Sequence, residues 1–383
     1  MKITESIYNV GVSDEVIDLF EGQFRTHSGM SYNSYVLLDS EIAVFDSVEA
    51  AHGEEWLENI KNTVGERTVD YLIVQHMEPD HSANIALFCK SFPLAKIVST
   101  EKSFSMMKHF FSLDLEGRKI AVKEGDTLSV GSRKLKFISA PMVHWPEVVV
   151  VYDEKEKTLF SADAFGKFGS SRVKEEWLDE ARRYYIGIVG KYGAQVQVLL
   201  KKLSGLSVER ICSLHGPVLE ENIEEYVSIY EKWSSYTPEK DGVLIAYASI
   251  YGNTRLAAEM LAREFSGKIE TELVDLTRCD KHYAVAEAFK YSKLVLACAT
   301  YNAELFPPMR EFITELVERN FQARCVGIIE NGSWAPMAGK LIKSALEKCK
   351  ALSFCEPVVK ILSSVDEQSL AEIKQLANEI LKI

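Results

Sequence analysis

The sequence contains few cysteines, and none of them form a closely spaced pair. Its seven cysteines are an odd number and include no C-x-x-C motif. This pattern argues against a disulfide framework and against a metal site made of thiolates. We expect most of the cysteines to be small buried hydrophobic residues.

Long hydrophobic runs and basic stretches are also missing. No apolar run approaches about 18 residues, and residues 1–20 lack the basic start, apolar core and cleavage site of a signal peptide. The net charge is −12 without a Lys/Arg-rich stripe, which works against nucleic acid or anionic lipid as a partner. We therefore expect a cytoplasmic protein that binds neither nucleic acid nor a membrane.

The sequence does have a globular composition and more than one domain's length. Hydrophobic residues make up 47% of its 383 residues and charged residues 26%, and we find no low-complexity segment or repeat. One hydrophobic core usually stops growing at roughly 250–300 residues. The polar stretch 234–241, which contains Pro238, has the composition of a linker. We predict domains at residues 1–238 and 239–383.

The two halves have different patterns. In the first, strands are predicted at 34–47, 71–75, 134–140, 148–152 and 158–161, and helices at 53–62, 100–112 and 174–203, which indicates packed layers. In the second, strands at 243–249, 269–276, 294–300, 325–331 and 357–362 alternate with helices at 254–265, 284–290, 308–318, 336–349 and 366–381. This alternation predicts a doubly wound, five-stranded parallel sheet in an α/β domain.

A dense group of potential metal ligands follows the apolar run 71–75. Four such residues fall within six positions: His76, Glu78, Asp80 and His81. Alternate residues of an extended segment project to one face, so the first three could converge on one pocket, with His81 presented from the turn. Three more candidates stand at predicted strand ends, where a rigid scaffold offers side chains to a site: His144, Asp163 and His215.

Any one of these histidines alone would more often be a surface residue or a hydrogen-bonded core residue. Four close ionisable groups on one loop are different, because without partners they would carry a desolvation cost that a metal would remove. The cluster therefore predicts a metal site, and two metals could share the loop.

The loop resembles the H-x-H-x-D-H segment of the metallo-β-lactamase superfamily, with Glu78 in the second histidine's place. The H-x-E-x-D-H form is similar to the iron-binding loop of flavodiiron proteins, and its oxygen-rich donor set suits redox iron more than zinc. The resemblance implies an N-terminal metallo-β-lactamase-like αββα sandwich. It further implies one iron bound by His76, Glu78 and His144, another by Asp80 and His215, and a bridging Asp163. For His81 it implies either iron binding or a place beside the iron.

Three further residues are candidates for the border of this pocket. His27, and Tyr184 or Tyr185, could supply protons or hydrogen bonds to a bound gas. A surface position for His27 and ordinary helix packing for the tyrosines are the alternatives. The family resemblance implies a tyrosine near the iron in this region.

A hydroxyl-rich turn opens the first predicted helix of the second half. Backbone N–H groups and the positive end of the helix dipole attract an anion there, and Gly252 permits its close approach. An ordinary tight turn with a helix N-cap is the alternative. The turn resembles the phosphate loop of flavodoxins, and its residues are Ser249, Ile250, Tyr251, Gly252, Asn253 and Thr254.

Two later loops are expected at the same carboxyl edge of the parallel sheet. In flavodoxin-like sheets such loops hold the isoalloxazine ring, with aromatic side chains stacked on it. We expect Tyr301 and Trp334 beside the ring, although either could instead pack in the core. No G-x-G-x-x-G fingerprint supports an NAD or FAD site, so FMN is the expected cofactor. The loop residues are Thr300, Tyr301, Asn302, Asn331, Gly332, Ser333 and Trp334.

Over nearly the whole chain, the resemblance implies an oxidoreductase in which FMN feeds a non-haem di-iron site. That site would reduce dioxygen to water, nitric oxide to nitrous oxide, or both. The resemblance also implies a head-to-tail homodimer, or a dimer of such dimers, in which one subunit's FMN meets the partner's irons. The sequence ends without the C-x-x-C pairs of a fused rubredoxin, so we expect an external electron donor, with rubredoxin as the first candidate.

Two other functional classes compete with this interpretation. A binuclear zinc hydrolase of the metallo-β-lactamase class would use the same loop, but Glu78 and the second domain argue against it. A flavin-bearing electron carrier with a vestigial metal site would lack ligands, whereas all seven positions are filled.

Overall fold

The computed structural model describes residues 1–383, which divide into two compact units. Unit 1 comprises residues 1–185 and 194–231, and unit 2 comprises residues 186–193 and 232–383. The residues around Pro238 form the turn between α7 (Ile223–Ser234) and β16 (Lys240–Ala248). None of the helices has the length and apolar character needed to span a membrane.

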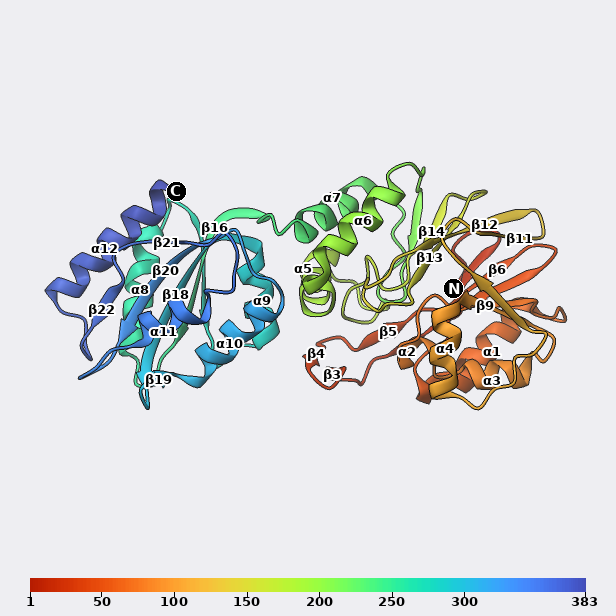
Figure 1. Ribbon diagram of the computed structural model, residues 1–383, viewed down its shortest axis with the longest axis horizontal. Coiled ribbons are helices and arrows are strands. Elements are labelled where there is room, and N and C mark those ends of the chain that lie inside the picture. The colour runs from red at the N-terminus through yellow and green to blue at the C-terminus, as the bar shows by residue number, and fades with distance from the viewer. The chain divides into compact units, whose positions relative to one another are not determined.

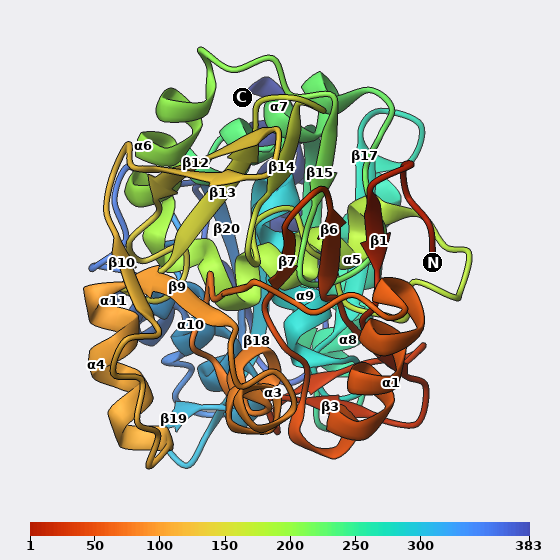
Figure 2. The ribbon, with the colours of Figure 1, turned by 90° about the vertical axis from the view of Figure 1, so that its right-hand side faces the viewer.

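Unit 1 is built on two sheets packed face to face. One has the order β1 (Ile7–Asn9), β6 (Tyr35–Leu38), β7 (Ile42–Phe45), β8 (Tyr71–Ile73), β9 (Lys96–Thr100) and β10 (Lys119–Val122); Figure 2 shows β1, β6 and β7 side by side. The other has the order β11 (Thr127–Val130), β12 (Arg133–Ser139), β13 (Val149–Asp153), β14 (Thr158–Phe160) and β15 (Arg210–Cys212). Their inner faces share one core, in which the rings of Phe45 and Phe160 stack with centroids 3.8 Å apart.

Helices cover the outer faces of this pair of sheets. Figure 1 shows α1 (Gly53–Val64), α3 (Ile85–Ser91) and α4 (Glu101–Phe110) on one side, and α6 (Gly193–Leu203) and α7 on the other. The spacing of apolar residues explains the helix packing: α1 buries Trp56, Leu57, Ile60 and Val64 along one face. The expected αββα sandwich is thereby confirmed.

Two of the elements predicted for residues 1–238 are wrong in detail. The run 34–47 is a hairpin of β6 and β7, because residues 39–41 turn the chain back. The long helix predicted at 174–203 is broken into α5 (Trp177–Tyr184), a π-helical turn (Tyr185–Val189), a 3-10 turn (Gly190–Tyr192) and α6. Glycines at 187, 190 and 193 explain the break, since glycine disfavours a helix interior.

Unit 2 is the predicted doubly wound parallel sheet. The strand order is β17 (Glu270–Asp275), β16, β18 (Tyr291–Tyr301) and β20 (Cys325–Asn331), and then a fifth strand in two pieces, β21 (Ser353–Phe354) and β22 (Val359–Ile361). Short β19 (Glu304–Leu305) pairs antiparallel with β18. Order 2-1-3-4-5 is that of flavodoxin-like folds.

Both faces of this sheet are covered by helices. In Figure 1, α8 (Asn253–Phe265) and α12 (Glu367–Lys382) lie on one face, and α9 (Lys281–Lys290), α10 (Pro307–Glu318) and α11 (Ala338–Ala345) on the other. Strand β20 is buried at every residue, which accounts for the apolar run at 325–329. The carboxyl ends of β16, β18 and β20 therefore carry the loops predicted to bind FMN.

Candidate functional site

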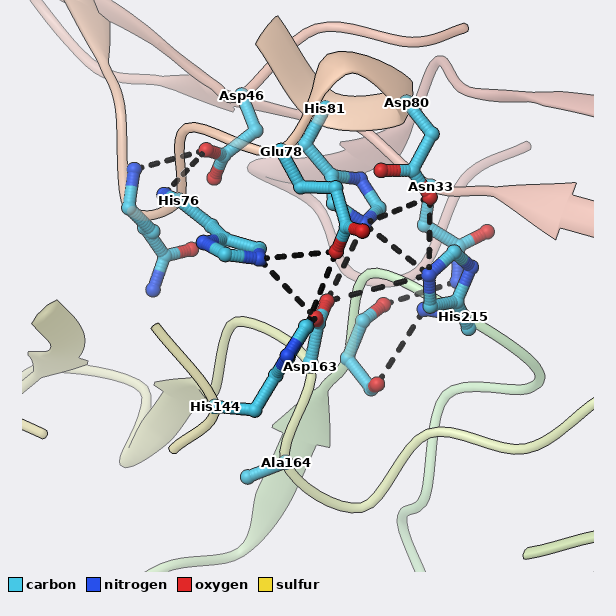
Figure 3. Close-up of polar contacts among 12 residues, drawn as sticks. Asn33, Asp46, His76, Glu78, Asp80, His81, His144, Asp163, Ala164 and His215 are labelled. Carbon is cyan, nitrogen blue, oxygen red and sulfur yellow. Dashed lines mark hydrogen bonds and ion pairs between the residues drawn. The ribbon is translucent and has the colours of Figure 1, made fainter. Parts of the chain in front are cut away.

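The seven predicted metal ligands gather in unit 1 at the ends of strands (Figure 3). They form two groups, and within each group the potential ligand atoms lie within 4.8 Å of one another. The first group consists of His76, Glu78, His144 and Asp163; the second consists of Asp80, His81 and His215. All but Glu78 are buried.

The local structure explains how one loop serves both groups. After β8 the chain runs through His76 and Glu78, and Pro79 then begins the short helix α2 (Pro79–Ser82). Asp80 and His81 therefore lie on a helical turn. The expectation that His76, Glu78 and Asp80 converge from one extended segment is wrong, because this turn directs Asp80 to the second group.

Asp163 connects the two groups. Its Oδ2 lies 3.4 Å from Nε2 of His76 and 3.0 Å from Nε2 of His144, and its Oδ1 lies 3.2 Å from Nε2 of His81. Glu78 Oε2 contacts the same two nitrogens of the first group, at 3.2 and 3.0 Å. In the second group, Asp80 Oδ2 is 3.3 Å from Nε2 of both His81 and His215. Asp163 therefore has one carboxylate oxygen within reach of each group.

Hydrogen bonds on the far side of the rings fix two of the histidines. His215 Nδ1 lies 2.7 Å from the Ser31 carbonyl oxygen, and His76 Nδ1 lies 2.8 Å from Glu147 Oε1. A carbonyl or carboxylate oxygen accepts, so Nδ1 carries the proton in both rings and a neutral ring offers its Nε2 lone pair to the cluster. His81 differs, because its Nδ1 is buried without a hydrogen-bond partner.

The electrostatics of the cluster favour positive charge. Burial alone would raise the pKa of Asp163, but the neighbouring His76 and His81 hold it well below the ordinary value. Burial alone would lower the pKa of His144, but the carboxylates of Asp163 and Glu78, each 3.0 Å from its Nε2, raise it to about 9. The two shifts show that the carboxylates and the imidazoles stabilise each other's charges, and the raised pKa of His144 reflects the negative potential of the carboxylates, which attracts a cation.

The residues proposed for the border of the site occupy different surroundings. Tyr184 is buried, and its ring centroid lies 5.4 Å from that of His215. Tyr185 is buried against Tyr230, with centroids 5.0 Å apart. His27 is exposed and belongs to neither group of potential ligands. The structure therefore brings one of the three, Tyr184, against a member of the cluster.

Several residues around the cluster were missed by sequence reasoning. Glu147 orients His76 and accepts the Met77 backbone N–H at 2.9 Å. Asp46, which follows β7, accepts the backbone N–H groups of Gln75 and His76, and burial raises its pKa to about 8. Asp46 is an acidic residue near the end of the strand predicted at 34–47, so its position was a usable signal. Glu147 gave a weaker one, three residues after His144.

Unit 2 has a pocket of about 440 Å³ at the carboxyl edge of its sheet. Every lining residue is uncharged. Twelve of the thirteen predicted cofactor residues line it: Ser249, Ile250, Tyr251, Asn253, Thr254, Thr300, Tyr301, Asn302, Asn331, Gly332, Ser333 and Trp334. The thirteenth, Gly252, lies within the turn itself. The loops after β16, β18 and β20 thus converge as predicted.

The turn before α8 leaves the helix N-terminus open. Gly252 adopts φ +97° as the N-cap residue, and no side chain caps the helix. Its N–H donates to Ser249 Oγ at 3.1 Å, which holds the turn closed on itself. The unused N–H groups and the helix dipole make this end suited to an anion.

The two ring-side candidates do not pack in the core. Trp334 is 91% exposed and Tyr301 45% exposed, so both offer aromatic faces at the pocket. Ser363, which the sequence did not point to, also lines the pocket. Its hydroxyl donates to Ser333 Oγ at 2.8 Å, and its backbone N–H donates to Asn331 Oδ1 at 3.2 Å. The loop after β22 is therefore a fourth wall of this pocket.

Comparison with known proteins assigns both units. Residues 30–216 match the ODP family of β-lactamases, and residues 245–377 match flavodoxin. An anaerobic nitric oxide reductase flavorubredoxin of Aliivibrio fischeri is 28% identical over 359 residues, which is 90% of this chain and 72% of the relative. The corresponding Escherichia coli protein is 26% identical over 360 residues, covering 90% and 74%.

Solved structures share the fold across both units. The rubredoxin oxygen:oxidoreductase of Desulfovibrio gigas has a TM-score of 0.92 at 24% identity, covering all of this chain and 98% of its own. The flavodiiron protein of Giardia intestinalis has a TM-score of 0.89 at 24% identity, covering all of this chain and 95% of its own. The chain therefore combines a β-lactamase-like domain with a flavodoxin domain, and it is similar across both to flavorubredoxins and, in fold, to flavodiiron proteins.

Proposed function

We propose that this protein reduces dioxygen to water, nitric oxide to nitrous oxide, or both, with electrons supplied through FMN. The observation that carries the proposal is the pair of ligand groups that share Asp163, in the same chain as an uncharged pocket behind an open helix N-terminus. The relatives' names support both substrates, since one is a nitric oxide reductase and another an oxygen oxidoreductase.

Two metals fit the cluster. The side-chain oxygens of Asp80 and Asp163 are buried and receive no hydrogen bond, a costly state that metal coordination would relieve. His81 Nε2 and His215 Nε2 lie 3.1 Å apart. A cation bound by both neutral rings would explain why these two nitrogens face the same point. A donor set of carboxylates and imidazoles suits iron.

We assign the first metal to His76, Glu78 and His144 and the second to Asp80, His81 and His215, with Asp163 shared. FMN would occupy the pocket of unit 2, its phosphate at residues 249–254 and its ring beside Tyr301 and Trp334. When bound, the irons supply electrons and Lewis acidity and FMN supplies electrons to them. The chain's residues hold these groups, and no protein nucleophile is required.

The surroundings of His215 indicate how the chain shields the site. The rings of Phe20, Tyr32 and Tyr184 lie with centroids 5.4, 6.0 and 5.4 Å from that of His215. This aromatic wall excludes water from one side of the second group. Burial raises the pKa of Tyr184 well above its ordinary value, so its hydroxyl stays protonated and can donate a hydrogen bond to a bound gas. We assign His27 and Tyr185 no contact with the gas.

The remaining assignments concern partners and organisation. Electron transfer requires FMN and metals to approach closely, and we propose that a head-to-tail homodimer, which can pair into a dimer of dimers, brings them together. We further propose an external electron donor of the rubredoxin type, a cytoplasmic location and a domain boundary at residue 238. The flavodoxin match disfavours the zinc hydrolase, which does not use a flavin.

Gas consumption by the reconstituted protein tests the proposal. The protein is loaded with ferrous iron and FMN without oxygen, reduced, and supplied with dioxygen or nitric oxide. We expect both cofactors to bind and at least one gas to be consumed. In the Asp163→Asn variant, gas consumption should fall by at least about 100-fold, while FMN binding stays normal. The loss should be this large because even the removal of a partner behind a metal ligand costs about 10- to 100-fold. A loaded protein that consumes neither gas but hydrolyses an ester or phosphodiester would overturn the proposal.

A further inference from the structure

Three of the four buried histidine rings of the cluster have unequal support behind them. A carboxylate, Glu147, stands behind His76; a neutral backbone carbonyl, that of Ser31, stands behind His215; and His81 Nδ1 has no hydrogen-bond partner. The proton on Nδ1 is held in the first two rings and not in the third. The two ligand groups therefore also differ in the hydrogen bonds behind their histidine rings.

Glu147 is itself held in place. It is 2% exposed, and its Oε1 receives both His76 Nδ1, at 2.8 Å, and the Met77 backbone N–H, at 2.9 Å. A hydrogen bond to a carboxylate is stronger than one to a carbonyl. It also makes Nε2 of the imidazole a stronger electron-pair donor to a metal, and it fixes the orientation of the ring.

The carboxylates of the two groups point the same way as this hydrogen bond. With Asp163 shared, each group has three potential donors of its own. In the first group Glu78 Oε2 has hydrogen-bond contacts with the rings of His76 and His144. In the second group neither oxygen of Asp80 receives a hydrogen bond that would orient it. The first group is thus better ordered and more electron-rich before any metal arrives.

We propose that Glu147 is a positioning residue for His76 and that it makes the first metal position bind its ion more tightly than the second. The metal at Asp80, His81 and His215 is then the last to bind and the first to leave. This inference rests on the proposed function, in that it takes the cluster to hold two metals. Beyond that function, the two metals load in a fixed order, and this order depends on Glu147, a residue that does not touch either metal.

Titration of the full-length apoprotein with Co²⁺ without oxygen tests the inference, because Co²⁺ absorption reports each coordination site. We expect two classes of site in the wild-type protein, with affinities that differ at least about tenfold. Glu147→Gln should weaken the tighter class about 10- to 100-fold, the usual effect of losing a partner behind a ligand, and leave the weaker class unchanged. Asp80→Asn should abolish the weaker class alone, which assigns it.

Glu330→Gln is the matched control, because Glu330 is also a buried glutamate that accepts a backbone N–H, from Gly339 at 2.9 Å in unit 2. It should leave both affinities unchanged. Two equal classes in the wild type, or equal weakening of both by Glu147→Gln, would overturn the inference and leave the proposed function intact. A wild-type apoprotein that binds no Co²⁺ would overturn the two-metal centre, and this inference with it.

Discussion

Arg133 is a buried cation surrounded by carboxylates, none of which belongs to the metal-ligand cluster. It is 5% exposed, and its guanidinium lies 2.5 Å from Asp153, 2.6 Å from Glu156 and 3.4 Å from Asp39. Asp153 is fully buried. At this residue stability depends on pairing rather than on apolar burial, because each ion alone would face a large desolvation cost.

Replacing this arginine should therefore destabilise unit 1 strongly. Arg133→Ala leaves Asp153 buried without its counter-ion, and we expect a loss of about 3–5 kcal/mol in the free energy of unfolding. Urea unfolding followed by hydrogen exchange in β12 and β13 measures this loss. Arg255→Ala, which breaks an exposed pair with Glu259, should leave the free energy of unfolding nearly unchanged. Equal effects of the two changes would contradict the account.

Residues of the metal-ligand cluster could be named from the sequence because they are dense and chemically distinctive. Four of them lie within positions 76–81, and the desolvation argument needs only that close spacing along the chain. Glu147 could not be assigned in the same way, since its partner His76 is 71 positions away. A single glutamate carries no sign of which ring it will meet in the folded chain.

At the scale of elements, the N-terminus of α8 combines strain and function at one position. Gly252 has φ +97°, and a Cβ built there would meet nothing within 4 Å. A side chain at this position would therefore cost backbone strain but no collision. Gly267, beyond the other end of the same helix, has φ +70° and equally open surroundings. The two glycines differ mainly in that Gly252 belongs to the turn at the pocket.

Alanine at each glycine separates the two effects. Gly252→Ala and Gly267→Ala should each cost about 1–2 kcal/mol of stability from the left-handed backbone. Only Gly252→Ala should also weaken FMN binding, by about tenfold if a similar free energy of about 1.4 kcal/mol is lost on binding. Flavin fluorescence titration measures the affinities. Normal FMN affinity in Gly252→Ala would remove the turn from the phosphate site.

Element prediction succeeded where one physical signal dominated. The strand predicted at 325–331 coincides with β20, because a strand covered on both faces carries an apolar run, here residues 325–329. It failed at 174–203, where an amphipathic pattern continued across three glycines that interrupt the helix. It also missed the two-part fifth strand, since the separate pairing of β21 and β22 with β20 depends on neighbours that the local sequence does not reveal.

At the scale of the whole molecule, the two sites lie in separate units of one chain. The ligand groups belong entirely to unit 1 and the pocket entirely to unit 2. A substitution can therefore disable the site in one unit without changing any residue of the site in the other. This separation makes the proposed head-to-tail dimer testable by complementation.

Two inactive variants should restore activity in a mixed dimer. Ser249→Asp places a carboxylate in the turn expected to hold the FMN phosphate, and Asp163→Asn removes the shared ligand. A heterodimer isolated with two different tags keeps one subunit's FMN and the partner's metals, so it should regain about half of the wild-type gas consumption in a two-fold dimer. Homodimers of either variant serve as controls. A heterodimer as inactive as both homodimers would show that electrons pass within one subunit.

The central claim is that one chain holds a di-iron site and FMN for the reduction of a small gas. Metal and flavin analysis of the purified protein tests it most directly, followed by an anaerobic assay to which a known amount of dioxygen or nitric oxide is added. We expect two irons and one FMN per chain, with turnover of dioxygen, nitric oxide or both. Two zinc ions, no flavin and hydrolysis of an ester or phosphodiester would contradict it.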